Sequence, residues 1–213
     1  MPSPTLVWLR TDLRVADNPA LAAAAEAGGA VIPVYIHDPE SERSWRARGA
    51  SEAWLHHALE DLAVQFAKLG SPLVIRHGDS LAELRALAKE TGAVAVTWNR
   101  RYEPAVRERD TRIKAALRAD GLKADSFNGA LLHDPAQVKT LAGNPFQVFT
   151  PFWKNCLANL PFEAPLSAPR KLTGPAKAPK SLKVEALGLK PRITWDVGFW
   201  KAWDPTRRGA EQR

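Results

Sequence analysis

Polar and charged side chains gather in four short segments of the chain, and each segment directly follows an apolar run. The segments are Arg10–Arg14, His37–Asp38, His77–Asp79 and Asn99–Glu103. Guanidinium groups can hold anionic or carbonyl groups of a ligand, and carboxylates accept hydrogen bonds from ring N–H or hydroxyl donors. These residue types predict a polar binding site of mixed charge, suited to a flat heteroaromatic or anionic molecule.

The same residues predict neither a catalytic set nor a metal site. The five histidines lack the spacing of metal ligands, and the adjacent His56 and His57 are typical of helix-packing or surface residues. The single cysteine, Cys156, excludes an internal disulfide and any cysteine-based zinc site. The turn after the first apolar run contains no glycine, and the chain has neither a G-x-G-x-x-G nor a Walker sequence, so binding of NAD or a nucleoside triphosphate is not expected. The residues by themselves therefore indicate a binding domain.

Apolar runs alternate with amphipathic segments over the first 130 residues. We expect strands at Leu6–Leu9, Val31–Ile36, Leu73–Arg76, Val94–Trp98 and Leu122–Phe127. Helices are expected between them, with N-caps at Asn18, Ser51 and Ser80. Continuous apolar strands separated by such helices are typical of a parallel sheet that is covered on both faces. The predicted fold is α/β, a doubly wound, Rossmann-like parallel sheet of five strands whose carboxyl ends bring the four polar segments together.

The last part of the chain differs from the first in composition and charge. Residues 170–213 hold 11 of the 30 Lys and Arg residues and only four of the 23 acidic ones, so the net charge of +7 belongs to this tail. A basic tail can make weak contacts with nucleic acid through phosphates. The Pro- and Lys-rich stretch from Pro161 to Pro191 also has the composition of a solvated, extended linker, which we favour. The Trp-rich residues 193–213 are too few to bury their own rings and need a partner surface.

Four segments together resemble the N-terminal half of DNA photolyases and cryptochromes. They are "LVWLRTDLRVADNPAL", "WNRRYEPAVRERD", "LLHDPAQVKTLAGNPFQVFTPFWKN" and the "W…W-x-P" segment at Trp200–Pro205. They follow one another in the family's order and cover nearly the whole chain. The resemblance implies an antenna domain over residues 1–130, a helical extension over 131–160, and, over 161–213, a linker and the start of a helical FAD-binding domain that is missing.

The resemblance also implies an antenna chromophore bound to the α/β domain. The R-x-D-L-R-x-x-D-N turn would then frame the chromophore pocket in place of a glycine-rich loop. Arg10 and Arg101 are expected to hold anionic or carbonyl groups of the chromophore, and Asp38 and Glu103 to accept hydrogen bonds from its ring N–H or hydroxyl groups. No catalytic residue and no metal ligand is expected in this chain.

The type of chromophore is predicted from positions at which this chain differs from members of the family. Ala105 and Val106 stand where folate-binding members carry an Asn-Glu pair, so the resemblance favours a deazaflavin or a flavin over folate. Arg101 stands where those members often place an acidic residue, and it can form a bidentate pair with a phosphate. FAD is expected only together with the missing helical domain.

The resemblance implies the antenna domain of a deoxyribodipyrimidine photolyase-like protein, whose excited, reduced FAD repairs pyrimidine dimers in DNA. The chain alone is not expected to be catalytic, because the family's FAD-binding residues lie in the helical domain. That domain and, indirectly, DNA are the expected partners. No apolar run approaches the roughly 20 residues that span a bilayer, so we expect no membrane partner. The single cysteine fits a reducing compartment, so we expect a cytoplasmic location. The alternative is a cryptochrome-like light-sensing or nucleotide-binding module without repair activity.

Overall fold

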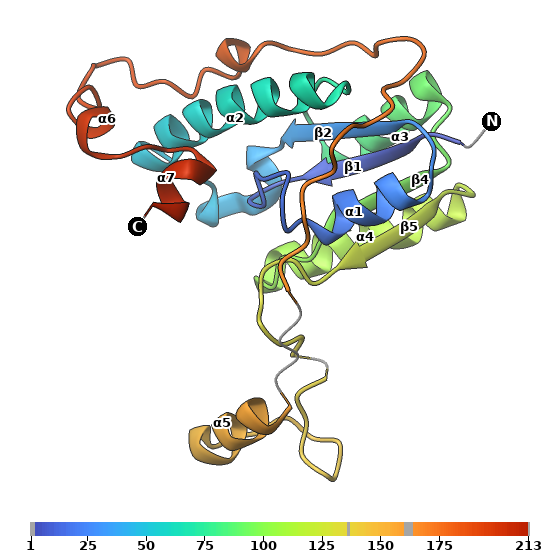
Figure 1. Cartoon of the computed structure of the whole chain (residues 1–213), viewed down its shortest axis with the longest axis vertical. Helices are drawn as coiled ribbons and strands as arrows, with labels where there is room; N and C mark the ends of the chain where they lie inside the picture. Colours follow the sequence, from blue (N-terminus) through green and yellow to red (C-terminus); the bar gives the residue numbers. More distant parts are fainter. Residues whose placement is uncertain (1–2, 136, 160–163, 213) are drawn as a thin grey trace.

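A computed structural model describes residues 3–135, 137–159 and 164–212 of the chain. At its centre five parallel strands form one sheet in the order β3-β2-β1-β4-β5 (Figure 1). The strands are β1 (Thr5–Leu9), β2 (Val31–His37), β3 (Val74–His77), β4 (Ala95–Asn99) and β5 (Lys123–Phe127). The predicted doubly wound α/β fold is therefore confirmed. The direction of winding changes between β1 and β4, and ligand crevices form at such a point.

Four helices cover the two faces of the sheet. They are α1 (Pro19–Glu26), α2 (Ala50–Leu69), α3 (Ser80–Thr91) and α4 (Pro104–Ala119). Apolar side chains of α1 and α2, such as Leu21 and Phe66, pack on one face, and those of α3 and α4, such as Leu84 and Leu117, pack on the other. Every residue of β1 is buried, as the middle strand of a doubly covered sheet requires.

The helix caps agree with the prediction at α1 but not at α2 and α3. The side chain of Asn18 caps α1, as predicted. The prediction of Ser51 as the cap of α2 is wrong, because Gly49 holds that position with φ of +55°, a conformation that glycine adopts without strain. The prediction of Ser80 is wrong as well. The carboxylate of the preceding Asp79 caps α3 instead, since it accepts a hydrogen bond of 2.8 Å from the backbone N–H three residues on.

Residues 131–135 and 137–159 belong to an arm that projects from the α/β body and carries α5 (Phe149–Ala158) at its far end (Figure 1). The side chains of Phe149, Phe152 and Trp153 on α5 are exposed. The rings of Phe149 and Trp153 stack, with centroids 6.2 Å apart. The arm thus presents an aromatic face that nothing in the described part of the chain covers. The domain boundary expected between residues 160 and 161 lies outside the described residues.

After the arm, the chain returns to the body as an extended segment, residues 170–192, which we call the strap. Leu172 and Leu189 are buried in the same apolar layer as α1 and α2. A backbone hydrogen bond of 2.9 Å from Leu182 to the carbonyl of Ile75 fixes the strap to β3. The extended linker is therefore present, but it is fastened to the body, which corrects the expectation of a solvated linker.

The remaining elements are short. They are the 3₁₀ helices η1 (Pro39–Trp45) and η2 (Val184–Leu187) and the helices α6 (Phe199–Ala202) and α7 (Arg207–Glu211). The Trp-rich end packs on α2, where the ring of Trp200 lies 6.1 Å from that of Trp54 and 4.4 Å from that of His57. Part of the partner surface that these rings require thus lies on this domain, while Trp195, Phe199 and Trp203 stay more than 40% exposed. Among the described residues, no helix has the length and apolar character needed to cross a membrane.

Candidate functional site

A cavity of about 520 Å³ opens at the carboxyl ends of β1 and β2. Its walls come from η1, the first half of α2, the loop after β4 and three residues near the C-terminus, Pro205, Thr206 and Ala210. The cavity lies at the carboxyl edge of the parallel sheet, where ligands of such folds bind, and its volume is within the range of sites that hold cofactor-sized ligands. It is the candidate ligand site of the domain.

A buried cluster of charged groups forms one wall of the cavity. Arg10, which directly follows β1, donates from Nη1 to Oδ2 of Asp110 at 2.7 Å. Oδ1 of Asp110 accepts from Nη2 and Nε of Arg109 at 2.9 and 3.0 Å. The guanidinium carbons of Arg10 and Arg109 lie 4.4 and 5.2 Å from the ring centroid of Trp8, within cation–π range. One carboxylate from α4 therefore holds two guanidinium groups against one indole ring.

The glycine-free turn after β1 is held by buried polar side chains. Asn99, at the end of β4, donates from Nδ2 to Asp12 at 2.6 Å and to Asn18 at 2.8 Å. Arg14 donates to the backbone carbonyl of Gly129 at 2.5 Å. A Cβ atom at Gly129 would lie 2.6 Å from the side chain of Asn99, so only glycine fits there. The charged turn is thus a brace between the first and fourth strands, which positions Arg10 beside the cavity.

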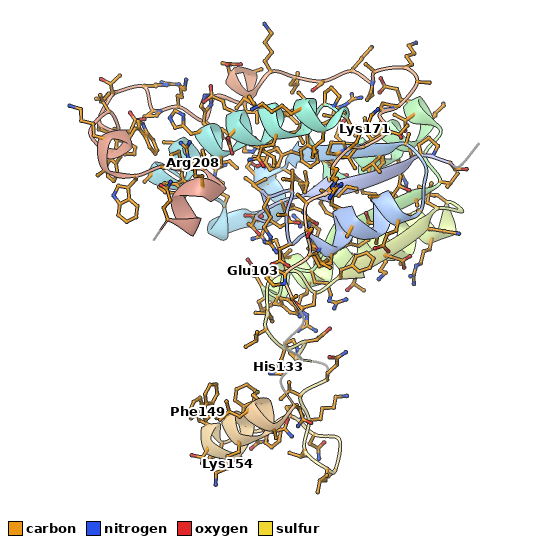
Figure 2. All side chains as sticks on the ribbon, viewed as in Figure 1. Glu103, His133, Phe149, Lys154, Lys171 and Arg208 are labelled. Atoms are coloured by element: carbon orange, nitrogen blue, oxygen red, sulfur yellow. The ribbon has the colours of Figure 1, made fainter. Side chains whose placement is uncertain are left out.

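Arg101 lines the cavity and bridges two carboxylates. Its guanidinium donates to Glu42 of η1, and to Oε1 of Glu103 at 2.8 and 3.2 Å. Burial by itself would lower the pKa of Arg101, but the hydrogen bonds with Glu103 and Glu42 outweigh burial and raise it. Glu103 does not line the cavity and lies at the edge of the body near the base of the arm (Figure 2). Glu103 therefore positions Arg101 rather than facing the cavity itself.

Asp38 lines the cavity at the end of β2, and much of its carboxylate is already engaged. Oδ2 accepts from the backbone N–H and the hydroxyl of Ser80 at 2.9 and 2.6 Å. Oδ1 accepts from the backbone N–H of Ser41 at 3.2 Å. These bonds join β2 to η1 and α3. Because each carboxylate oxygen has two acceptor positions, Oδ1 keeps one for a ligand.

Tyr35 and His37 of β2 add two titratable groups to the cavity. Burial raises the pKa of Tyr35, and the nearby charge of Glu42 raises it further, so the phenol stays protonated and can donate a hydrogen bond. Burial, followed by the neighbouring His77, lowers the pKa of His37. The two imidazole centroids lie 5.4 Å apart. At neutral pH His37 is therefore a neutral imidazole that can donate from one ring nitrogen and accept at the other.

Two buried N–H groups beside the cavity have no hydrogen-bond partner among the described residues. They are Nε1 of Trp8 and Nε of Arg10, and both residues line the cavity. Trp8 is 1% exposed and Arg10 is 7% exposed. A buried donor without an acceptor costs roughly 1–3 kcal/mol. The site therefore fits a planar heteroaromatic ligand that brings carbonyl oxygens or ring nitrogens as acceptors.

Three of the four predicted ligand residues line one cavity, namely Arg10, Asp38 and Arg101. Sequence reasoning missed Arg109 and Asp110, although both stand at helix positions where the pattern of α4 calls for apolar residues. It also missed Trp54, Pro205, Thr206 and Ala210. No sequence signal identifies Pro205, Thr206 and Ala210, because they reach the cavity only when the C-terminal part of the chain packs on α2.

A doubly wound parallel sheet with a cavity at the carboxyl ends of its strands defines an α/β ligand-binding domain with Rossmann-like topology. The braced, glycine-free turn sets it apart from domains that bind dinucleotide phosphates. This chain belongs to the DNA photolyase family, because the family model described as DNA photolyase matches residues 5–170.

Individual relatives agree with this assignment. The chain is 44% identical over 209 residues to a deoxyribodipyrimidine photo-lyase of Agrobacterium fabrum, covering 98% of this chain and 43% of the relative. It is 40% identical over 171 residues to Cryptochrome-1 of Arabidopsis thaliana, covering 79% of this chain and 25% of the relative. The crystal structure of a class III photolyase from Agrobacterium tumefaciens matches with a TM-score of 0.91 at 43% identity, over 100% of this chain and 44% of that chain. The chain thus spans less than half the length of these relatives.

Proposed function

We propose that this chain is the antenna-chromophore domain of a photolyase-like protein and that the cavity beside Arg10 holds the chromophore. The unpartnered N–H groups of Trp8 and Arg10 in this wall carry the proposal. When bound, the chromophore would absorb near-UV or blue light and pass the energy on to FAD. The residues of this chain bind and orient it and keep water from its ring.

Each lining residue has a role that follows from its contacts. Trp8 and Arg10 donate to carbonyl oxygens on the ring, while Asp110 holds Arg10 in place. Arg101 pairs with an anionic or carbonyl group of the ligand, and Glu103 positions Arg101. Asp38 accepts from a ring N–H or hydroxyl at Oδ1.

A deazaflavin or a flavin is the proposed chromophore, in preference to folate. Ala105 and Val106 occupy the positions at which folate-binding relatives carry Asn and Glu. Arg46 also lines the cavity, and its guanidinium pairs with the exposed Glu40 at 3.3 Å. An exposed pair of this kind is weak, so Arg46 can exchange Glu40 for a ligand phosphate. A flavin mononucleotide would place its phosphate there.

The relatives extend well beyond the region that this chain matches, and the proposed partners lie in that further region. We propose that a helical FAD-binding region packs on the arm and that DNA is reached through that region. In this proposal residues 1–130 form the antenna domain, 131–160 its extension, and 161–213 the connection to the helical region. Light-driven repair of pyrimidine dimers would need both parts, so this chain alone is not the catalyst. The single cysteine fits a cytoplasmic location.

A light-sensing role without repair is the second candidate, and the identity of 40% to Cryptochrome-1 favours it. The repair role and the light-sensing role would use the same chromophore, but only the repair role includes a reaction on DNA. Repair of dimer-containing DNA under blue light, after this chain is combined with the helical region of the Agrobacterium photolyase, would be expected only of a photolyase. A light-dependent change in association without repair would be expected of a sensor.

Ligand titration tests the proposed chromophore site. We expect FMN or an 8-hydroxy-5-deazaflavin to bind the chain with one-to-one stoichiometry, followed by absorbance and by quenching of tryptophan fluorescence, and methenyl-folate to bind more weakly. Ala47→Trp fills the cavity from an exposed lining position and should abolish binding. Ala67→Trp, at an exposed position of α2 that does not line the cavity, is the matched control and should bind as the parent does. Binding of none of the three compounds, or equal binding by Ala47→Trp, would contradict the proposal.

A further inference from the structure

The strap carries a strong excess of positive charge at the surface. Over residues 170–192 it has seven basic side chains and one acidic one, Glu185. All seven basic residues are exposed: Arg170, Lys171, Lys177, Lys180, Lys183, Lys190 and Arg192. Lys171 lies on the part of the strap that passes over the α/β body (Figure 2).

This charge is not balanced by the protein itself. Nine arginines of the body and the base of the arm form ion pairs with carboxylates: Arg10, Arg14, Arg46, Arg76, Arg85, Arg100, Arg101, Arg109 and Arg118. Within the described residues, none of the seven basic side chains of the strap has a carboxylate within 4 Å. Most described arginines of the body are thus paired internally, with Arg48, Arg107 and Arg112 as exceptions, whereas all seven cations of the strap are left to solvent or to an external partner.

The strap is held in a fixed extended course, so its cations are arranged before any partner arrives. Besides the buried Leu172 and the bond from Leu182 to Ile75, the backbone N–H of Lys180 donates to Glu90 at 2.7 Å. The strap runs along α2 on the outside of the molecule (Figure 1). A fixed array loses little conformational entropy on binding, unlike a flexible basic tail.

The spacing of the lysines suits a linear polyanion. Lys177, Lys180 and Lys183 follow one another at intervals of three residues. In an extended chain, three residues span roughly 10 Å. Duplex DNA carries one negative charge for about every 1.7 Å of its axis, so each lysine meets a phosphate without any particular register. The residues between these lysines are mainly small ones (Ala178, Pro179 and Ser181), which permit close approach to a backbone.

We infer that the strap is a binding surface for the phosphate backbone of duplex DNA, independent of sequence and of any lesion. The surface is separate from the chromophore cavity, since no residue of the strap lines it. It would hold the domain on DNA by non-specific electrostatic contact. Such contacts give dissociation constants on the order of 10⁻⁶ to 10⁻⁴ M at physiological salt.

The structure favours nucleic acid over an anionic membrane as the partner. Proteins that lie on membranes insert the apolar face of an amphipathic helix. The strap contains one helical element, the four-residue η2, and its residues Leu172, Val184 and Leu189 point into the body instead of outward. It therefore offers charge without an apolar face to insert.

Fluorescence anisotropy with an undamaged, labelled 20-base-pair duplex tests this inference on the full chain. We expect binding at 50 mM salt that weakens steeply as salt is added. The triple variant Lys177→Ala, Lys180→Ala and Lys183→Ala should lose at least about tenfold in affinity. The slope of log K against log salt should become shallower by about 2 to 3, since each phosphate contact contributes about 0.9.

A second triple variant distinguishes the effect of the strap on DNA binding from the effect of the net charge of the chain. Lys123→Ala, Lys139→Ala and Arg112→Ala remove the same charge from exposed positions on β5, the arm and α4. This variant should bind DNA nearly as the parent does, and a strap variant with arginine at the three lysine positions should retain binding. Equal loss in both alanine triples, no binding by the parent at 50 mM salt, or preferential binding to vesicles of anionic phospholipid would each overturn the inference. The alanine triple variant of the strap should bind the chromophore as the parent does. A negative result for DNA binding would therefore leave the proposed chromophore site unaffected.

Discussion

The guanidinium of Arg10 and the carboxylate of Asp110 form an ion pair of 2.7 Å in which the side chains are only 5% and 11% exposed. The two residues are 100 positions apart in sequence and join the end of β1 to α4. Asp110 also forms an ion pair with Arg109, so Arg10, Asp110 and Arg109 make a buried triad. Burying a charged group costs free energy unless an opposite charge lies beside it. Each member of the triad therefore needs the others in place, and together they fix the wall of the cavity.

Removal of Asp110 should therefore destabilise the domain strongly. Asp110→Ala leaves Arg10 and Arg109 buried without their shared carboxylate, and breaking a buried pair in this way costs about 3–5 kcal/mol. Urea unfolding followed by tryptophan fluorescence would measure the change in free energy. Asp125→Ala, which removes a partner from the exposed Arg118 pair, is the control and should have a much smaller effect. Similar losses of unfolding free energy in the two variants would show that burial does not increase the contribution of the triad to stability.

The sequence predicted β1 and β2 well because each is a nearly continuous apolar run, as a doubly covered sheet requires. The edge strand β5, with the sequence KADSF, is not such a run. The sequence also predicted that Arg10, Asp38 and Arg101 would come together, because the carboxyl ends of parallel strands meet at one edge. The caps at Ser51 and Ser80 were misplaced because several neighbouring residues, here Gly49 and Asp79, can each serve as a cap. Local sequence does not decide between such neighbours.

The triad could have been found from the pattern of α4. Val106, Asp110, Ile113 and Leu117 follow one another at intervals of four, three and four residues, and all four are buried. A carboxylate within an otherwise apolar helical stripe predicts a buried cationic partner. The identity of that partner depends on tertiary packing, so Arg10 could not be assigned from the helix by itself.

Acidification should weaken the fold through His37. Burial and then His77 lower its pKa, while Glu52, Asp38 and Glu42 act in the opposite direction without cancelling the shift. The unfolded chain takes up the proton near the ordinary histidine pKa of about 6.5, and the folded protein does so only at lower pH. The stability that a neutral His37 contributes is thus fully present above about pH 6.5 and is lost as the pH falls toward its folded pKa.

Unfolding free energies at several pH values between 7.5 and 5 would test this dependence. His37→Gln should flatten the loss of stability on acidification. Part of the dependence should persist in His37→Gln, since burial also lowers the pKa of His56. An unchanged pH profile in His37→Gln would contradict the assignment of the effect to this residue.

The anchored strap should contribute to the stability of the α/β body. Leu172 is 3% exposed in the layer shared with α1 and α2, so Leu172→Ala should lower the unfolding free energy by about 2–4 kcal/mol. Leu182→Ala, at a strap side chain that is 41% exposed, is the control and should have a much smaller effect. A free linker would show no loss at either position, and that result would mean that the strap is not docked in solution.

The aromatic face of α5 should matter for association and not for folding of this chain. Phe149 and Trp153 are 70% and 48% exposed, so the double variant Phe149→Ala and Trp153→Ala should change the unfolding free energy by less than about 0.5 kcal/mol. The same variant should weaken binding to the separately produced helical region of the Agrobacterium photolyase, because the apolar rings are the surface that the proposed partner would bury. Lys154 points away from Phe149 on α5 (Figure 2), and Lys154→Ala should bind as the parent does. Calorimetric titration would measure the three affinities. Equal affinities for the parent and the double variant would place the contact with the helical region elsewhere on the domain.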